Sequence, residues 1–166
     1  MNVINIIEKD IRIAIFGLSG NPPTGIGGHA GVVRHLVNTN SFDEIWILPV
    51  YRHSYSSKSS LVLYDHRVNM CRLNFESEST NKCIVKVLTL EKEVYEPILS
   101  LETKKCSNSN IPVPTISMGS IDIIKYILNQ ISSNNINNVS LPRISLVLGS
   151  DTYNDLMSGK WKNGAE

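Results

Sequence analysis

Four short apolar segments that favour β-strands alternate with helical segments, and this alternation constrains the fold more than any other feature of the chain. The expected strands cover 11–17, 45–50, 83–91 and 143–149. Helical patterns begin at His29, cover 65–75 and 120–131, and begin again near Asp151. Strands that are apolar on both faces and separated by helices are typical of a parallel sheet covered on both sides. We therefore expect an α/β fold with a mainly parallel sheet between two helical layers, α/β/α, of the Rossmann-like kind.

The expected sheet also indicates where a ligand would bind. In open parallel sheets, ligands bind in the crevice beyond the carboxyl ends of the strands. The segments that follow the four expected strands are 17–29, 50–58, 91–120 and 149–155. Functional side chains are therefore expected in these four segments, whatever the chemistry.

Composition narrows the class of protein. The 166 residues are 42% hydrophobic, which predicts a single domain over 1–166 with one core. A formal net charge of +1 gives no reason to expect a nucleic-acid partner. The three cysteines form no CxxC pair, so we expect reduced thiols, without a disulfide framework or zinc site. Neither a signal peptide nor an apolar stretch of roughly 18–20 residues is visible, so we expect no membrane association and a cytoplasmic location.

The segment G17-L-S-G-N-P-P-T-G-I-G-G-H29 is the most informative of the four. Small residues allow the backbone to approach a phosphate closely, and free N–H groups at a helix start can bind it. A tight strand–helix turn with an incidental histidine is the structural alternative. The GxxxxGK[ST] phosphate loop is excluded because no lysine follows these glycines. A GxGxxA match at Gly25, Gly27 and Ala30 begins too far from the strand to favour a dinucleotide-binding dehydrogenase.

This segment resembles the G-[ST]-F-[DN]-P-x-[HT]-x-G-H signature of the nucleotidyltransferases, and especially of the nicotinate/nicotinamide mononucleotide adenylyltransferases. The matching residues are Gly17, Asn21, Pro22, Thr24, Gly28 and His29. Ser19-Gly20 stands where the family usually has a phenylalanine, and four residues separate Thr24 from His29 where the signature has two. The resemblance implies that the ATP phosphates are bound by this segment, through Gly17, Leu18, Ser19, Asn21, Thr24 and Gly28, with His29 as a catalytic residue.

Three further segments follow the order of the same family. Pro49 is followed by Lys58 and then by Arg67 and Met70, as in the family's Lys-bearing loop and R-x-x-M helix. The resemblance gives Lys58 a catalytic role and Arg67 a role in mononucleotide binding; a solvated surface lysine is the alternative. Residues 117–122 resemble the family's S-Y-T-x-D-T segment, which assigns Ser120 and Asp122 to the mononucleotide. Both residues would also suit a helix start.

The last expected strand ends in Gly149 and Asp151 and is followed by Trp161, similar to the family's G-x-D and later tryptophan. Gly149 and Asp151 would then contact ATP and Trp161 the mononucleotide; an N-cap at Asp151 and edge packing of Trp161 are the alternatives. The family's I-S-S-T-x-x-R motif is not found. The resemblance spans about 11–162, so we expect a nucleotidyltransferase-like domain that is C-terminally incomplete.

The resemblance implies transfer of AMP from ATP to nicotinate or nicotinamide mononucleotide, with release of pyrophosphate, in NAD biosynthesis. ATP and a pyridine mononucleotide would be the partners, Mg²⁺ would be held mainly by ATP phosphates without a dedicated protein metal site, and a homo-oligomer is possible. Two alternatives stay open. One is another adenylyl- or cytidylyltransferase, such as the pantetheine-phosphate type. The other is a nucleotide-binding protein with impaired catalysis.

Overall fold

The computed structural model describes residues 10–52, 61–106, 119–134 and 141–160. Its four strands are β1 (Arg12–Leu18), β2 (Glu44–Pro49), β3 (Ile84–Val87) and β4 (Arg143–Val147), and they form one sheet in the order β3-β2-β1-β4. All three strand pairs are parallel: Ile15 of β1 lies opposite Trp46 of β2 and Leu146 of β4. The four carboxyl ends therefore meet at one edge, as expected from the sequence.

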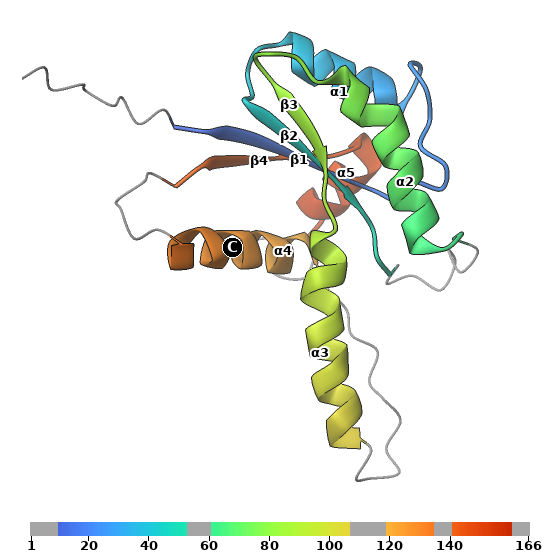
Figure 1. The fold of residues 1–166 in the computed structure, drawn as a ribbon, viewed down its shortest axis with the longest axis vertical. Coiled ribbons are helices and arrows are strands. Elements are labelled where there is room, and N and C mark those ends of the chain that lie inside the picture. The colour runs from blue at the N-terminus through green and yellow to red at the C-terminus, as the bar shows by residue number, and fades with distance from the viewer. Residues whose placement is uncertain (1–9, 53–60, 107–118, 135–140, 161–166) are drawn as a thin grey trace, which may run out of the picture.

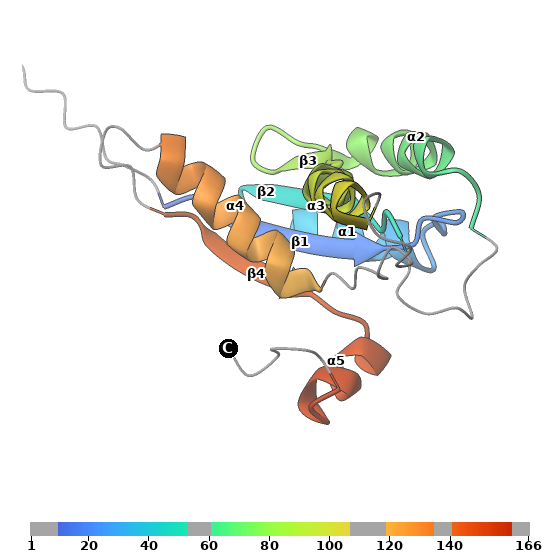
Figure 2. The ribbon, with the colours of Figure 1, turned by 90° about the horizontal axis from the view of Figure 1, so that it is seen from below.

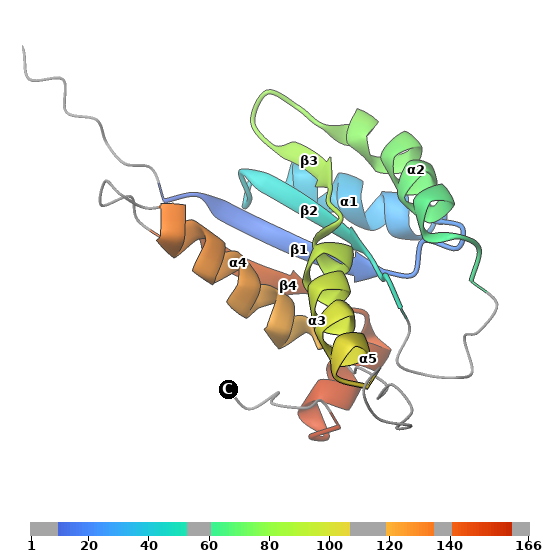
Figure 3. The same ribbon diagram turned by 60° about the horizontal axis from the view of Figure 1, so that its bottom comes forward.

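Helices cover both faces of this sheet, which confirms the three-layer Rossmann-like α/β/α architecture (Figure 2). Helices α1 (His29–Asn38) and α2 (Tyr64–Phe75) pack on one face, through buried residues that include Val33 and Phe75. Helix α4 (Ser120–Asn134) packs on the other through Ile123 and Ile127. Figure 3 shows α4 and α1 on opposite sides of the strands.

Burial along β1 explains its central position. Five of its seven residues are buried, because α1 and α2 cover Ala14 and Phe16 while α4 covers Ile13 and Ile15. A strand enclosed on both faces needs apolar residues at consecutive positions, which is the pattern in the sequence. By contrast, β4 lies at an edge of the sheet, and Leu146 is 37% exposed.

The third expected strand is too long, and a helix was missed. Strand β3 ends at Val87 instead of residue 91, and α3 (Leu90–Cys106) follows it, where no helix was expected before residue 120. The first residues of α3 pack on the sheet through Leu90 and Val94, whereas Leu101 is 59% exposed. Figure 1 shows α3 extending away from the sheet. Pro97 lies inside this helix, which is why the sequence pattern does not predict it.

The remaining elements are short. Helix α2 begins at Tyr64, one residue before the expected start, with Leu63 at its N-cap and Asp65 in its first turn. The 3₁₀ turn η2 (Glu76–Glu78) leads into β3, and α5 (Ser150–Met157) follows β4 with none of its residues buried. Figure 2 shows α5 beyond the β4 edge. Within the described ranges, no helix is both long and apolar enough to span a membrane.

Candidate functional site

The loop after β1 folds back onto the start of α1 and holds His29 through Thr24. The Thr24 main-chain N–H donates to His29 Nδ1 at 3.0 Å, and Thr24 Oγ1 lies 2.7 Å from the same nitrogen. The His29 main-chain N–H donates to Thr24 Oγ1 at 2.9 Å. The imidazole also packs near Phe16, with ring centroids 6.0 Å apart. His29 is thus half-buried and fixed at the carboxyl edge of the sheet.

This arrangement changes how the helix start could bind a phosphate. The sequence predicts free N–H groups there, but the N–H groups of His29 and Ala30 donate to Oγ1 and the carbonyl of Thr24. The turn is closed by the Gly28 N–H, which donates to the Gly25 carbonyl at 2.9 Å. These two helix donors are therefore engaged within the loop, and the His29 side chain becomes the main candidate for binding an anion.

Three glycines are required by close packing around this loop. An added Cβ at Gly28 would lie 2.1 Å from Thr24 Oγ1, and one at Gly31 would lie 2.0 Å from the Ile26 carbonyl oxygen. Gly20 has a φ of +61°, and its Cβ would lie 2.7 Å from Cys71 Sγ. The glycine-rich composition thus allows the loop to fold tightly against α1 and α2.

Gly17 and Leu18 do not lie in the loop, because β1 continues to Leu18. Leu18 is buried in the core, and its carbonyl accepts the Val50 N–H at 2.9 Å. The loop begins at Ser19, whose carbonyl accepts from Arg67, and Asn21 Oδ1 accepts the Val62 N–H at 3.1 Å. Ser19 and Asn21 thus tie the loop to the neighbouring segment at this edge.

Arg67 is buried at 2% exposure and connects three backbone segments. Its guanidinium donates to the carbonyls of Val62 (3.0 Å), Ser19 (2.7 Å), Val50 (2.6 Å) and Tyr51 (3.4 Å). Burial lowers the pKa of Arg67 below its ordinary value. These carbonyls accept from all three guanidinium nitrogens, so Arg67 helps to hold the loops together. The contact with the mononucleotide that the resemblance implies stays a prediction.

Glu91, which the sequence analysis did not select, lies beside this arginine at the start of α3. Its Oε2 accepts the Tyr51 main-chain N–H at 2.8 Å, and burial raises its pKa to about 7, although the Tyr51 N–H and Arg67 both act to lower it. The only feature of the sequence that could have indicated Glu91 is its position as an acidic residue just after the third strand. It was missed because the expected strand ran on to residue 91.

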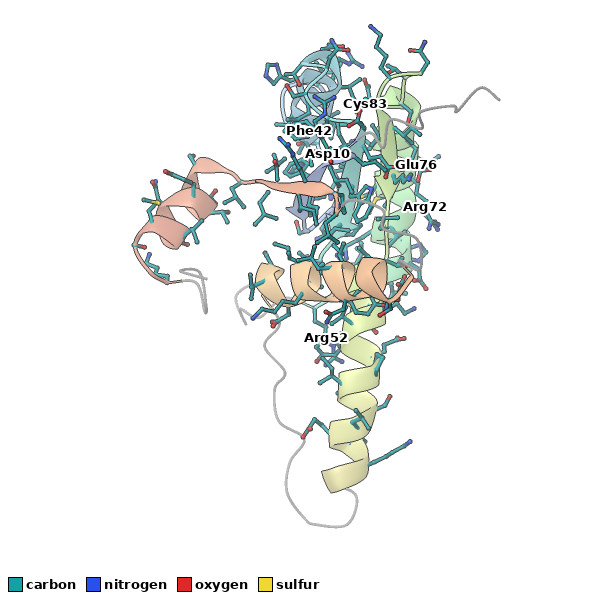
Figure 4. The ribbon with its side chains drawn as sticks, turned by 90° about the vertical axis from the view of Figure 1, so that its left-hand side faces the viewer. Asp10, Phe42, Arg52, Arg72, Glu76 and Cys83 are labelled. Atoms are coloured by element: carbon teal, nitrogen blue, oxygen red, sulfur yellow. The ribbon has the colours of Figure 1, made fainter. Side chains whose placement is uncertain are left out.

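Three tyrosines surround the end of β2 next to Glu91. The Tyr51 ring meets Tyr64 edge-on at 4.9 Å and Tyr95 at 5.5 Å between centroids. Arg52 donates to the Tyr95 hydroxyl at 3.2 Å, and Figure 4 places Arg52 beside α3, away from Phe42 and Cys83. The Tyr64 hydroxyl is buried without a hydrogen-bond partner among the described residues, and burial raises its pKa. These tyrosines pack the residues that follow β2 against α2 and α3.

Ser120 and Asp122 lie at the start of α4, as expected. Ser120 is the first residue of the helix, and Asp122 Oδ2 accepts the Gly119 N–H at 2.9 Å while its own N–H donates to the Gly119 carbonyl. Asp122 therefore closes the helix start, and a role for either residue in mononucleotide binding stays a prediction.

Gly149 and Asp151 lie at the end of β4, beside the end of β1. Gly149, and not Asp151, is the N-cap of α5, and Asp151 occupies the exposed first turn. A Cβ at Gly149 would lie 2.7 Å from Asp151 Oδ1, so the carboxylate folds back over the cap. Lys58 and Trp161 lie outside the described residues.

Neither a metal cluster nor a cysteine nucleophile is evident in the described ranges. They contain no group of three or more His, Cys, Asp or Glu side chains that could hold a metal ion. Cys71 lies near the loop, but burial raises its pKa to about 11, so its thiol stays protonated at neutral pH. Among the described side chains of this edge, His29 is the main candidate donor to a ligand.

Comparison with known proteins places these observations in a family context. No family model matches the chain. A segment of 61 residues is 31% identical to a Myxococcus xanthus (strain DK1622) protein described as "Probable nicotinate-nucleotide adenylyltransferase", and it covers 37% of this chain and 30% of that protein. The chain thus matches less than a third of the length of this curated relative.

Two solved structures of Plasmodium falciparum nicotinic acid mononucleotide adenylyltransferase share the fold. The one complexed with NaAD has a TM-score of 0.58 and 22% identity, over 93% of this chain and 58% of that one. The one complexed with APC has a TM-score of 0.56 and 22% identity, over 93% and 57%. The chain therefore spans somewhat more than half of these enzymes. The sequence comparison confirms the similarity to a nicotinate-nucleotide adenylyltransferase that the sequence predicts, and the solved structures confirm the fold.

Proposed function

We propose that this chain carries the ATP-binding part of a nicotinate mononucleotide adenylyltransferase. The observation that carries the proposal is the glycine-rich loop at the carboxyl edge of the sheet, which fixes His29 there by three contacts with Thr24. The sequence similarity to a protein described as a nicotinate-nucleotide adenylyltransferase supports nicotinate mononucleotide as the acceptor. The fold shared with two such enzymes supports the proposed domain architecture. The amide mononucleotide is the alternative acceptor.

The proposed reaction joins the two nucleotides without a covalent enzyme intermediate. A phosphate oxygen of the mononucleotide attacks the α-phosphorus of ATP, the bond from that phosphorus to the bridging oxygen breaks, and pyrophosphate leaves. Catalysis then depends on positioning and on donors that stabilise charge on the phosphate oxygens. We assign His29 to this stabilisation, and we assign Lys58 the same role from the resemblance.

Mg²⁺ would accompany ATP in this proposal. It is bound mainly by oxygen ligands and keeps several waters, so substrate phosphates can supply most of its coordination. It would neutralise phosphate charge, while the protein would hold the nucleotide at the edge formed by the loop, Gly149 and Asp151.

The test is product formation with each acceptor. Purified protein is incubated with ATP, Mg²⁺ and nicotinate mononucleotide, nicotinamide mononucleotide or pantetheine phosphate, and the products and pyrophosphate are quantified. We expect the dinucleotide from nicotinate mononucleotide. We expect His29→Ala to reduce the rate by about 10²–10³, the usual cost of losing one charge-stabilising donor. His35→Ala is the matched control, because His35 is exposed in the last turn of the same helix.

Three results would contradict this assignment. A His29→Ala rate equal to that of the unmodified protein would remove His29 from the site. A product formed only from pantetheine phosphate would favour the other transferase branch. Binding of ATP without release of pyrophosphate from any acceptor would favour a nucleotide-binding protein that lacks catalysis.

A further inference from the structure

We propose that Thr24 is a positioning residue that holds His29 in the tautomer protonated at Nε2, so that Nε2–H is the donor offered to an anionic oxygen. This inference rests on the proposed function for the identity of that oxygen, but the tautomer can be tested without any ligand. The argument begins with the main-chain N–H of Thr24, which can donate and cannot accept.

The N–H of Thr24 lies 3.0 Å from His29 Nδ1 with hydrogen-bond geometry. A neutral imidazole has one nitrogen that donates and one that accepts. Since Nδ1 faces a donor, it must present its lone pair, and the ring proton resides on Nε2. Hydrogen bonding at one ring nitrogen is the usual way in which a protein selects the tautomer of a histidine.

The Thr24 hydroxyl acts in the same direction. Its oxygen accepts the His29 N–H at 2.9 Å and lies 2.7 Å from Nδ1, where its own hydrogen can be donated to the lone pair. The Thr24 hydroxyl thus contacts both the main-chain N–H and the imidazole ring of His29. Nε2 has no hydrogen-bond partner among the residues that the structure describes, so it is available to a ligand.

The residues between Thr24 and His29 bring the two into contact. The segment between them forms a turn in which the Gly28 N–H donates to the Gly25 carbonyl, and this turn brings Thr24 back over the helix start. Asn74 Nδ2, from α2, donates to the Thr24 carbonyl at 3.3 Å and holds the turn from outside. An added Cβ at Gly28 would lie 2.1 Å from Thr24 Oγ1, so this contact also requires glycine at that position.

The experiment combines tautomer spectroscopy with nucleotide binding. Long-range ¹H–¹⁵N correlation spectra of histidine-labelled protein distinguish Nε2–H from Nδ1–H rings. They are recorded at about pH 8.5, above the ordinary histidine pKa of about 6.5. The His29 signals are assigned by their loss in His29→Ala. ATP affinity is measured by titration calorimetry on the same samples.

We expect a single Nε2–H pattern for His29 in the unliganded protein. Thr24→Val keeps the side-chain shape and the main-chain N–H, but it removes the hydroxyl that contacts Nδ1 and holds residue 24 to the His29 N–H. Without that anchor the contact between the main-chain N–H and Nδ1 should loosen, so the variant should give a mixed tautomer pattern. It should also weaken ATP binding by about tenfold, the size expected when a residue that orients another is lost. Thr24→Ser should retain both properties. Gly28→Ala provides a second route to the same disruption, and circular dichroism checks that each variant is folded.

Either of two results would overturn the proposal. One is a His29 ring protonated at Nδ1 in the unmodified protein. The other is a folded Thr24→Val variant with an unchanged pattern and unchanged ATP affinity. A correct Nε2–H pattern that responds to Thr24→Val, in a protein that binds no ATP, would support the positioning role of Thr24 and refute the proposed function instead.

Discussion

Replacing Arg67 with methionine would remove the guanidinium while keeping a long apolar side chain in the same buried position. Three of its contacts, to the carbonyls of Ser19, Val50 and Val62, are 3.0 Å or shorter. A fully buried acceptor left without a donor costs about 1–3 kcal/mol. Ser19 and Val50 are only half-buried, Val62 is exposed, and the buried cation need no longer be desolvated, so the summed loss lies at the low end of this range. We therefore expect Arg67→Met to lower the free energy of unfolding by about 1–2 kcal/mol.

This loss is a measurable part of the roughly 5–15 kcal/mol by which a typical domain is stable. Urea denaturation followed by circular dichroism measures it directly. Arg72→Met is the matched control, because Arg72 is exposed in the last turn of the same helix and should change stability by less than about 0.5 kcal/mol. Arg67→Lys should fall between the two, since an ammonium group cannot reproduce the fork of guanidinium donors.

A different outcome would favour the role that the resemblance implies for Arg67. If Arg67→Met unfolds at the same urea concentration as the unmodified protein but binds nicotinate mononucleotide much more weakly, then Arg67 contacts the ligand and the carbonyl contacts are unimportant. The reasoning from burial would then be refuted.

Two further predictions concern stability. Gly20→Ala should destabilise the fold by about 1–3 kcal/mol in urea, because φ is +61° and the new Cβ would meet Cys71 Sγ, whereas Gly25→Ala, which meets no atom within 4 Å, should have a much smaller effect; equal midpoints for the two would contradict the packing. Glu91 has its pKa raised by burial from 4.5 to about 7, so the native state binds the proton more tightly than the unfolded state. Its stabilising contribution is therefore complete below pH 4.5 and lost as pH rises through 7. Glu91→Gln removes this pH dependence. As pH rises from 5 to 8, the urea midpoint of the variant should therefore increase relative to that of the unmodified protein; the opposite trend would show that folding lowers the pKa of Glu91.

Much of the fold could be predicted because its strongest signals are local. The continuous apolar run of β1 indicated a strand enclosed on both faces, and glycine-rich composition marked the loop that follows. Helix α3 was missed because Pro97 and a run of charged residues interrupt its apolar pattern. The end of β3 was placed too late, because Leu88 and Leu90 extend the strand-like sequence. Leu88 lies between β3 and α3 and Leu90 begins α3, and both pack against the core on the α4 side of the sheet.

The site was predicted less completely, because side-chain roles depend on contacts between distant segments. An arginine near the carboxyl edge suggests an anion ligand, but Arg67 meets carbonyls from three segments that only the folded chain brings together. Similarly, Glu91 accepts a hydrogen bond from the main-chain N–H of Tyr51, which lies just after β2 and 40 positions earlier in the sequence. Thr24 and His29 were both selected, yet their mutual hydrogen bonds depend on a turn whose length the family signature does not share.

The central claim, that the loop after β1 holds ATP phosphates through His29, is tested most directly by calorimetric titration of ATP into the unmodified protein, His29→Ala and His35→Ala. The account predicts saturable binding that weakens by at least about tenfold in His29→Ala, or roughly 1.4 kcal/mol, and stays unchanged in His35→Ala. Equal ATP affinity in all three proteins, or no binding to any of them, would contradict it.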